Sequence, residues 1–336
     1  MSNKSLFIRV KTYALYAVLF YNYYRLKIYS CLLFDTYLGG NMIHIVTDAT
    51  TDFPKQFYEK DFTVLPMGYM LDDEDFDGET KTITAKEFYD YMRAGRKTNT
   101  RMVDEATILK YVEPLLKEGK DVLYVVFSSG LSGTYDNAVR VFKELHEKYP
   151  ACKLAAVDSY NASMGEGLLV WYTLKKRAEG ASFEELCKYV EDTQAHLCSY
   201  FTVDDLKHLA RLGRVTKTAA FIGSLANIKP VLFVNSKGKL IPIAKVVSRK
   251  KSLKALVDKM EEKMLPVSEQ KKIFIGHGDC YDDAVFVKNE IEKRFGLGCV
   301  VIDYIGPVIG AHAGAGVVAL FFLGTDKFEK NDTSED

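Results

Sequence analysis

The chain has 336 residues, of which 48% are hydrophobic and 27% charged, enough apolar material for a sizeable core and, by its length, for two domains. Its 45 basic residues equal its 45 acidic residues, so no basic field exists to hold a nucleic acid, and none is expected as a partner. The six cysteines form no CxxC pair and no Cys/His cluster at zinc-site spacing. We therefore expect reduced thiols in a cytoplasmic protein without a metal site.

Residues 1–41 differ in composition from the rest, being rich in Tyr, Phe and Leu with Asp35 as their one acid. The longest uncharged stretch, residues 12–24, is shorter than the roughly 20 residues that cross a bilayer, so we expect no stable membrane insertion. A secretory signal is disfavoured because no small-residue cleavage site follows. Codons for Leu38-Gly39-Gly40-Asn41 can spell a ribosome-binding site before Met42. The hypothesis is a non-native or disordered extension, and the alternative is an interfacial amphipathic anchor.

From Met42 onward, short apolar runs alternate with longer amphipathic ones, as in βα units. Residues 43–46 are predicted to form a strand, and residues 48–52 the turn that leaves it. The continuous apolar run VLYVVF at residues 122–127 is typical of a strand buried on both faces of a parallel sheet. We place this strand at the centre of the first domain.

Two helix starts carry the spacing of a capping box, in which a hydroxyl and an acid three residues later satisfy the first free amides. Thr84 with Glu87 predicts a helix to about Arg93. Ser182 with Glu185 predicts a second helix, to about Tyr200. The domain boundary is expected near residues 196–203, which gives domains at residues 42–199 and 200–328.

The second half begins with a helical, glycine-punctuated stretch at residues 204–227 and then changes topology. Residues 229–234 and 240–246 are joined by a glycine-containing connection too short for a helical crossover, which predicts an antiparallel hairpin. Further strands are expected at residues 273–275 and 300–304, with a helix near 282–295 between them. The polar tail at residues 329–336 is expected to be disordered.

A serine- and glycine-rich segment, residues 127–135, lies between the buried strand and an amphipathic helix that runs to about Glu147. Hydroxyls and free N–H groups at a helix N-terminus favour an anion such as a carboxylate or phosphate. The alternative is an ordinary tight turn whose serine caps the helix. The segment has no Lys after its glycines and no GxSxG pattern, which disfavours nucleotide binding and an α/β-hydrolase elbow.

A second glycine-rich stretch, residues 305–316, contains His312. A histidine between glycines has little side-chain cover and can reach a ligand; the alternative is a loop histidine bonded to backbone. Gly213 suits a left-handed helix end, and the next residue, Arg214, either faces a ligand or another chain or is solvated.

Several short motifs in the same order resemble the DegV family over nearly all of residues 42–328. They are Val46-Thr47-Asp48, Asp77-Gly78, Thr98, residues 128–135, Val157-Asp158-Ser159, Val203-Asp204-Asp205-Leu206, Gly213-Arg214-Val215, Ile228-Lys229-Pro230 and residues 310–316. The resemblance implies an α/β fold of two domains: a first with a mainly parallel sheet flanked by helices and a second with a mixed sheet and helices, with the ligand between them.

The family is similar to the acyl-carrying subunit of bacterial fatty acid kinase. The resemblance implies a carrier without a cofactor or catalytic residue of its own, which holds a fatty acid such as palmitate, stearate or oleate for phospholipid metabolism. It would present the carboxylate to the ATP-dependent catalytic subunit of the kinase. Thr98, Ser129 and His312 would surround that carboxylate, with Arg214 nearby. The sequence leaves open whether Ser129 or Ser132 points inward.

The sequence departs from the family pattern in places. Ala49-Thr50 stands where a Ser-Thr pair is common, Thr98-Asn99-Thr100-Arg101 replaces Thr-Ser-Gln-Pro, and residues 312–316 replace His-x-Gly-Pro-Gly. Val247 occupies a position where Arg is common, beside Ser248-Arg249-Lys250-Lys251, near which the family often has a basic cluster that docks its kinase. These changes affect the expected pocket mouth and partner surface more than the expected lipid tunnel.

Two other functions remain open from the residues alone. A serine acyl hydrolase would use Ser129 or Ser132 as nucleophile and His312 as base, but it needs a carboxylate to orient the imidazole, and no sequence feature nominates one. A lipid sensor would bind the same ligand without passing it to a kinase.

Overall fold

A computed structural model of the protein describes residues 42–215 and 228–327. The predictions for residues 1–41, for residues 216–227 of the helical stretch and for the tail at 329–336 lie outside this range. Within the described part, no helix is both long and apolar enough to cross a membrane. The boundary at residues 199 and 200 stays a prediction.

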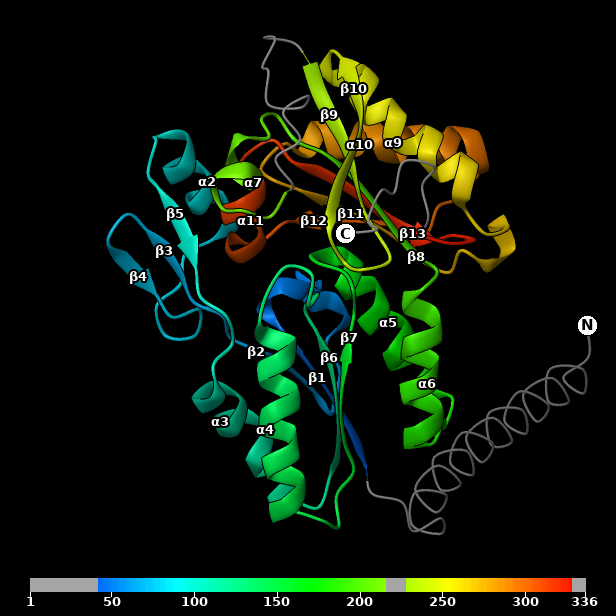
Figure 1. The fold of residues 1–336 in the computed structure, drawn as a ribbon. Coiled ribbons are helices and arrows are strands. Elements are labelled where there is room, and N and C mark those ends of the chain that lie inside the picture. Colours follow the sequence, from blue (N-terminus) through cyan, green and yellow to red (C-terminus); the bar gives the residue numbers. More distant parts are fainter. Residues whose placement is uncertain (1–41, 216–227, 328–336) are drawn as a thin grey trace, which may run out of the picture. The chain divides into compact units, whose positions relative to one another are not determined.

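The first sheet is parallel throughout and contains the strand that was expected to be buried. All residues of β6 (Asp121–Val126) are buried, which confirms that prediction. Helices α3 and α4 cover one face of the sheet, and α5 and α6 cover the other (Figure 1). The strand order is β2 (Phe62–Leu65), β1 (Ile43–Asp48), β6, β7 (Leu154–Asp158), and the helices are α3 (Glu105–Lys117), α4 (Thr134–Lys148), α5 (Met164–Ala178) and α6 (Phe183–Gln194).

The second sheet is mixed, and only its β11–β12 pair is parallel. Helices α9 (Arg249–Lys263) and α10 (Tyr281–Phe295) pack together on one of its faces (Figure 1). The predicted hairpin is confirmed, since β9 and β10 pair antiparallel. The strand order is β10 (Leu240–Val247), β9 (Ile228–Val234), β8 (Leu197–Thr202), β13 (Val318–Leu323), β11 (Ile273–His277), β12 (Val300–Tyr304).

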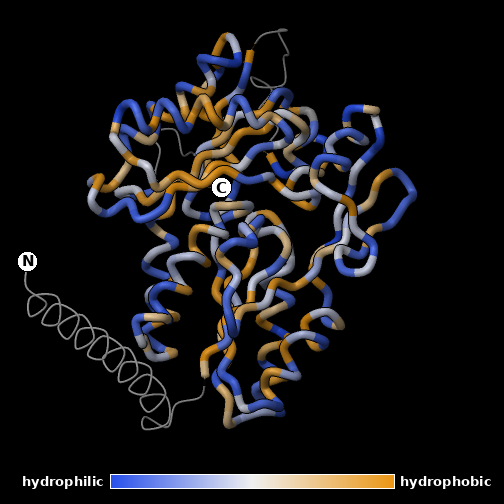
Figure 2. The backbone as a smooth tube through the Cα atoms, turned by 180° about the vertical axis from the view of Figure 1, so that it is seen from behind, coloured by the Kyte–Doolittle hydropathy of each residue, from blue (hydrophilic) through white to orange (hydrophobic). Residues whose placement is uncertain are grey.

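Helix α5 lies between the two sheets, which explains its composition. Every residue from Met164 to Leu174 is buried, so the helix is covered all round, as expected for a helix inside a core. It contacts β1 and β6 of the parallel sheet and β8, β11 and β13 of the mixed sheet. Figure 2, which colours each residue by its hydropathy, shows hydrophobic residues along the strands of the sheets.

A third, smaller sheet has the order β4-β3-β5 and lies beside helix α11 (Pro307–Ala313), which carries His312. Helix α11 contacts β5, α2 and α7. The capping box of Thr84 and Glu87 is present at the start of α2, which confirms that prediction. The elements are β3 (Tyr69–Leu71), β4 (Glu74–Phe76), β5 (Thr98–Thr100), α2 (Ala85–Arg93) and α7 (Lys207–Arg211); three short 3-10 helices are η1 (Ala49–Thr51), η2 (Lys55–Phe57) and η3 (Val267–Glu269).

Two local predictions were wrong. The helix that starts at Ser182 ends at Gln194, and the residues expected to extend it to Tyr200 form β8, because pairing with β9 and β13 overrides helical pattern there. His312 was expected in a loop with little cover, but it lies on helix α11. Pro307 is in the first turn of α11, where a proline favours helix initiation. Gly213 does adopt the predicted left-handed conformation after α7, with φ of 72°.

Candidate functional site

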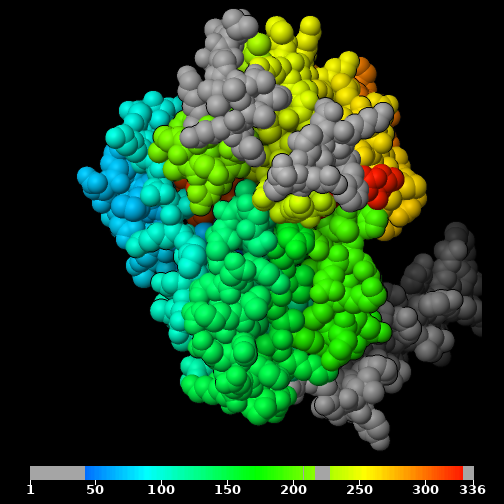
Figure 3. All heavy atoms as spheres, in the orientation of Figure 1, coloured from blue at the N-terminus to red at the C-terminus, as the bar shows by residue number. Residues whose placement is uncertain are grey.

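A cavity of about 310 Å³ lies between the parallel and mixed sheets, at the lower end of the range of roughly 300 to 1,000 Å³ typical of small-molecule sites. In Figure 3 a recess opens between the cyan, green and yellow-green segments of the chain. Most of the cavity wall is apolar and comes from both sheets and from α11. These side chains are Met67, Met102, Phe127, Leu131, Ala162, Phe201, Leu209, Val234, Leu240, Ile305, Val308, Ile309, Ala313, Val317, Ala319 and Phe321.

Four polar side chains in the lining belong together, and we call them the polar end: Thr100, Ser132, Arg214 and His312. The Oγ1 of Thr100 lies 2.8 Å from Nε2 of His312. The Nε of Arg214 donates to the carbonyl of Leu131, the residue before Ser132, over 3.2 Å. Three of the predicted ligand residues, Ser132, His312 and Arg214, are therefore brought together at one cavity.

His312 is neutral at pH 7 and holds an unused polar atom. Burial first, and then the positive charges of Arg214 and Arg211, lower its pKa to about 4. Its Nδ1 is buried without a hydrogen-bond partner. A buried polar atom without a partner is costly, so the described residues leave one hydrogen bond of this imidazole unmade.

Thr98 lies behind the polar end and outside the cavity lining. Its Oγ1 donates to the carbonyl of Ala311 over 2.8 Å, which joins β5 to the helix of His312. The Nη2 of Arg211 lies 3.4 Å from the same Oγ1. Thr98 thus positions α11, while Thr100, two residues on and on the same face of the strand, lines the cavity.

Ser129 is exposed and, like Thr98, lies outside the cavity lining. We call residues 128–133, which join β6 to α4, the serine turn. The carboxylate of Asp158 accepts the backbone N–H of Ser129 over 3.2 Å and that of Tyr160 over 2.8 Å. The anion-ready geometry expected from the sequence is therefore present, and the chain's own Asp158 occupies it.

The tip of the β9–β10 hairpin closes over the serine turn. The Oγ of Ser128 donates to the carbonyl of Gly238 over 2.9 Å. Gly238 has φ of 68°, and a Cβ there would lie 1.9 Å from that same Oγ. This contact ties the mixed sheet to the parallel sheet and holds Val234 and Leu240, which flank the tip, in the cavity wall.

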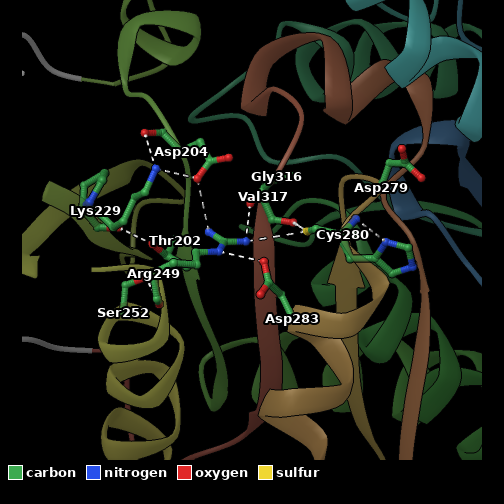
Figure 4. A network of polar contacts seen from close by, with 12 residues as sticks. Thr202, Asp204, Lys229, Arg249, Ser252, Asp279, Cys280, Asp283, Gly316 and Val317 are labelled. Atoms are coloured by element: carbon green, nitrogen blue, oxygen red, sulfur yellow. Dashed lines mark hydrogen bonds and ion pairs between the residues drawn. The ribbon is translucent and has the colours of Figure 1, made fainter. Parts of the chain in front are cut away.

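A network of polar contacts supports the loop that follows α11 (Figure 4). The guanidinium of Arg249 donates to the carbonyl of Gly316 over 2.5 Å and to Asp283 over 2.8 Å. Asp204 lies beside it and forms an ion pair of 2.7 Å with Lys229. The start of α9, the hairpin and α10 are thereby joined to the segment that carries His312.

The described residues offer no metal site and no complete hydrolase triad. No group of three or more His, Cys, Asp or Glu residues could hold a metal ion in the described ranges. The Oγ of Ser132 lies 2.9 Å from Oγ1 of Thr134, while the imidazole of His312 bonds Thr100. No carboxylate orients Nδ1 of His312, because that atom has no hydrogen-bond partner.

Three polar residues of the lining, Thr100, Arg101 and Ser163, were not among the predicted ligand residues. Thr100 and Arg101 had been noted only as departures from the family pattern that affect the pocket mouth. A signal existed for Thr100, because alternate residues of a strand share a face and Thr98 had been singled out. Nothing in the pattern around Ser163 distinguished it from an ordinary helix cap.

The fold and the cavity define an α/β protein with a parallel sheet, a separate mixed sheet and an apolar internal cavity with one polar end. Residues 42–325 match the family described as "Uncharacterised protein, DegV family". A DegV domain-containing protein of Clostridium perfringens is 41% identical over 84% of this chain and 98% of its own length. The chain belongs to the DegV family, as its motifs predicted.

Solved structures of the family share the fold. A fatty acid binding DegV family protein from Streptococcus agalactiae is 28% identical, with a TM-score of 0.75 over 84% of this chain and 99% of that one. A DegV lipid binding protein from Thermotoga maritima is 27% identical, with a TM-score of 0.73 over 85% of this chain and 100% of that one. The predicted two-domain fold class is confirmed.

Proposed function

We propose that the protein binds a long-chain fatty acid, such as palmitate, stearate or oleate, in the cavity between its sheets. The observation that carries the proposal is the composition of the cavity wall, which is apolar except at the polar end and at Arg101 and Ser163. Each buried methylene of an acyl chain contributes about 0.8 kcal/mol, so the chain supplies most of the affinity. The similarity to relatives described as fatty acid or lipid binding supports the same ligand class.

The carboxylate of the ligand belongs at the polar end. Neutral His312 offers the unused Nδ1 as a hydrogen-bond donor in one tautomer, and Arg214 supplies the positive charge that an ionised carboxylate requires. In that tautomer Nε2 of His312 accepts the hydroxyl of Thr100, so Ser132 of the serine turn provides the hydroxyl that donates to the carboxylate. These groups fix the orientation of the ligand, since hydrocarbon contacts alone leave either end free to enter first.

The second part of the proposal is that the carboxylate is presented to the catalytic subunit of an ATP-dependent fatty acid kinase, which forms an acyl phosphate. Arg214 is exposed as well as part of the lining, so the polar end reaches the surface. The chain has no Walker A motif of its own, which is consistent with a carrier that needs a partner for phosphoryl transfer. The carrier requires no cofactor.

The experiment is reconstitution of the fatty-acid-loaded protein with a DegV-partner fatty acid kinase subunit and ATP, with acyl phosphate as the readout. We expect acyl phosphate only when both proteins are present. His312→Ala should lower its formation at least about tenfold, because misplacing the attacking oxygen costs rate steeply. His146→Ala, at an exposed histidine on α4, is the matched control and should keep the rate. An unchanged rate in folded His312→Ala would contradict the proposal.

The serine hydrolase alternative receives less support. Its nucleophile and base would have to be hydrogen-bonded, whereas Ser132 and His312 bond different threonines. A fluorophosphonate probe tests it directly, because stoichiometric labelling of Ser132 would favour a hydrolase over a carrier.

A further inference from the structure

Two polar residues of the lining, Arg101 and Ser163, lie outside the polar end, and only Ser163 carries a hydroxyl. Ser163 belongs to the loop between β7 and α5 and is only 4% exposed. As the N-cap of α5 its hydroxyl would ordinarily accept an amide of the first turn, but it makes no capping hydrogen bond. Its Oγ instead donates to Oδ2 of Asp52 over 2.6 Å. The hydroxyl has been diverted from its usual structural role and faces the lipid cavity.

The backbone of Ser163 has an unfavourable conformation. Its φ of 54° and ψ of −148° lie in a region that residues with a side chain rarely adopt. Such conformations persist where the surroundings enforce them, and they are frequent at ligand clamps. The same loop contains Asn161, which is fully buried and whose Nδ2 has no hydrogen-bond partner. The loop therefore keeps polar groups beside an otherwise apolar wall.

The position of Ser163 relative to the polar end follows from α11. Asp52, the partner of Ser163, accepts the backbone N–H of Gly306 over 2.8 Å through its other oxygen. Gly306 is the N-cap of α11, and His312 follows it by six positions on the same helix. At the helical rise per residue these positions are about 9 Å apart along the axis. A ligand whose carboxylate contacts His312 therefore meets Ser163 several bonds further along its chain.

We propose that the cavity is adapted to a fatty acid that carries a hydroxyl group near the middle of its chain, with Ser163 as the hydrogen-bond partner of that hydroxyl. This inference rests on the proposed fatty-acid binding and deepens it by naming a ligand subclass. Ser163 gives its own proton to Asp52, so its oxygen keeps lone pairs that accept the ligand's O–H. Asp52 has no direct contact with the ligand in this arrangement and acts as a positioning residue.

The energetics favour discrimination without loss of ordinary fatty acids. A plain chain leaves Ser163 bonded to Asp52 and so strands no donor in the wall. A hydroxylated chain in a wholly apolar cavity would bury its hydroxyl without a partner, which weakens binding considerably. Ser163 removes that penalty only for a hydroxyl that reaches it. The wall therefore selects by the position of the hydroxyl.

The test compares three ligands on delipidated full-length protein: stearate, stearate hydroxylated next to its carboxylate, and stearate hydroxylated near mid-chain. The mid-chain hydroxyl is placed at about carbon 8, because the spacing of about 9 Å along α11 corresponds to roughly seven bonds of an extended chain. Affinities are measured by titration for the unmodified protein, Ser163→Gly and Ser132→Gly. Glycine at position 163 tolerates the observed φ and ψ, so this variant keeps the loop while removing the hydroxyl. Ser163→Ala serves as a second variant.

We expect Ser163→Gly to weaken binding of the mid-chain hydroxy acid about tenfold relative to stearate. The ratio for the other hydroxy acid should stay within about twofold, and Ser132→Gly should change stearate and the mid-chain hydroxy acid alike. If the unmodified protein binds stearate but the ratio does not depend on Ser163, this inference is overturned alone. If it binds none of the three ligands, the proposed function fails and this inference with it.

Discussion

The serine turn and the polar end of the cavity share Ser132 but differ in how their other polar atoms are used. In the serine turn, the N–H of Ser129 bonds Asp158 and the hydroxyl of Ser128 bonds Gly238, so the chain satisfies its own groups. At the polar end, Nδ1 of His312 is buried without a partner. A motif that favours an anion thus becomes a structural joint where the chain supplies the anion, and a ligand site where it does not.

The largest expected effect concerns the joint itself. Gly238→Ala places a Cβ at a left-handed φ and 1.9 Å from the Oγ of Ser128, so we expect it to lower the free energy of unfolding by about 3 kcal/mol. Gly180→Ala is the matched control, because Gly180 also has a positive φ but has open space around it, and it should cost about 1 kcal/mol. Urea unfolding measures both. Equal losses would show that the hairpin tip does not clamp the turn.

A somewhat smaller effect is expected for the internal anion. Asp158→Ala leaves the N–H groups of Ser129 and Tyr160 without their acceptor, which should destabilise the fold by about 2 kcal/mol. Asp158→Asn keeps one acceptor oxygen and should lose less. Fatty-acid affinity should hardly change in either variant, because Asp158 does not line the cavity. A large loss of affinity in folded Asp158→Asn would break the distinction between joint and site.

The polar end should show itself in pH dependence. The folded-state pKa of His312 is lowered from 6.5 to about 4. As pH falls below 6.5, His312 therefore becomes protonated in the unfolded chain while it stays neutral in the folded protein. The stability present above pH 6.5 is therefore lost as pH falls toward 4, by at most about 1.4 kcal/mol per unit. His312→Gln should reduce the loss between pH 7 and 5 by about 2 kcal/mol. An identical pH profile in the variant would contradict the assignment.

The smallest effect is expected at Ser129. Its side chain is exposed, so Ser129→Ala should change stability by less than about 0.5 kcal/mol and fatty-acid affinity by less than about twofold. Ser132→Ala, in the cavity lining, should change affinity more than Ser129→Ala does. The reverse order in binding titrations would place the ligand at Ser129, outside the cavity lining.

The sequence predicted most of the fold because the informative segments are local. The apolar run of β6 and the two capping boxes depend on neighbouring residues, and each is present in the structure. The strand at residues 197–202 was missed because its pairing partners are distant in sequence. For the same reason the sequence showed that residues 127–135 suit an anion but not that Asp158, on β7, fills that place. Ser163 was missed because its value depends on Asp52 and on a cavity formed by two sheets.

The central claim is that the cavity holds one fatty acid, and the most direct measurement is mass spectrometry of organic extracts from protein purified from bacteria. The account predicts about one long-chain fatty acid per chain, because the apolar wall would otherwise face water. Delipidated protein should take up added stearate to the same ratio. Extracts without fatty acid, from a folded protein that also fails to take up stearate, would contradict the account.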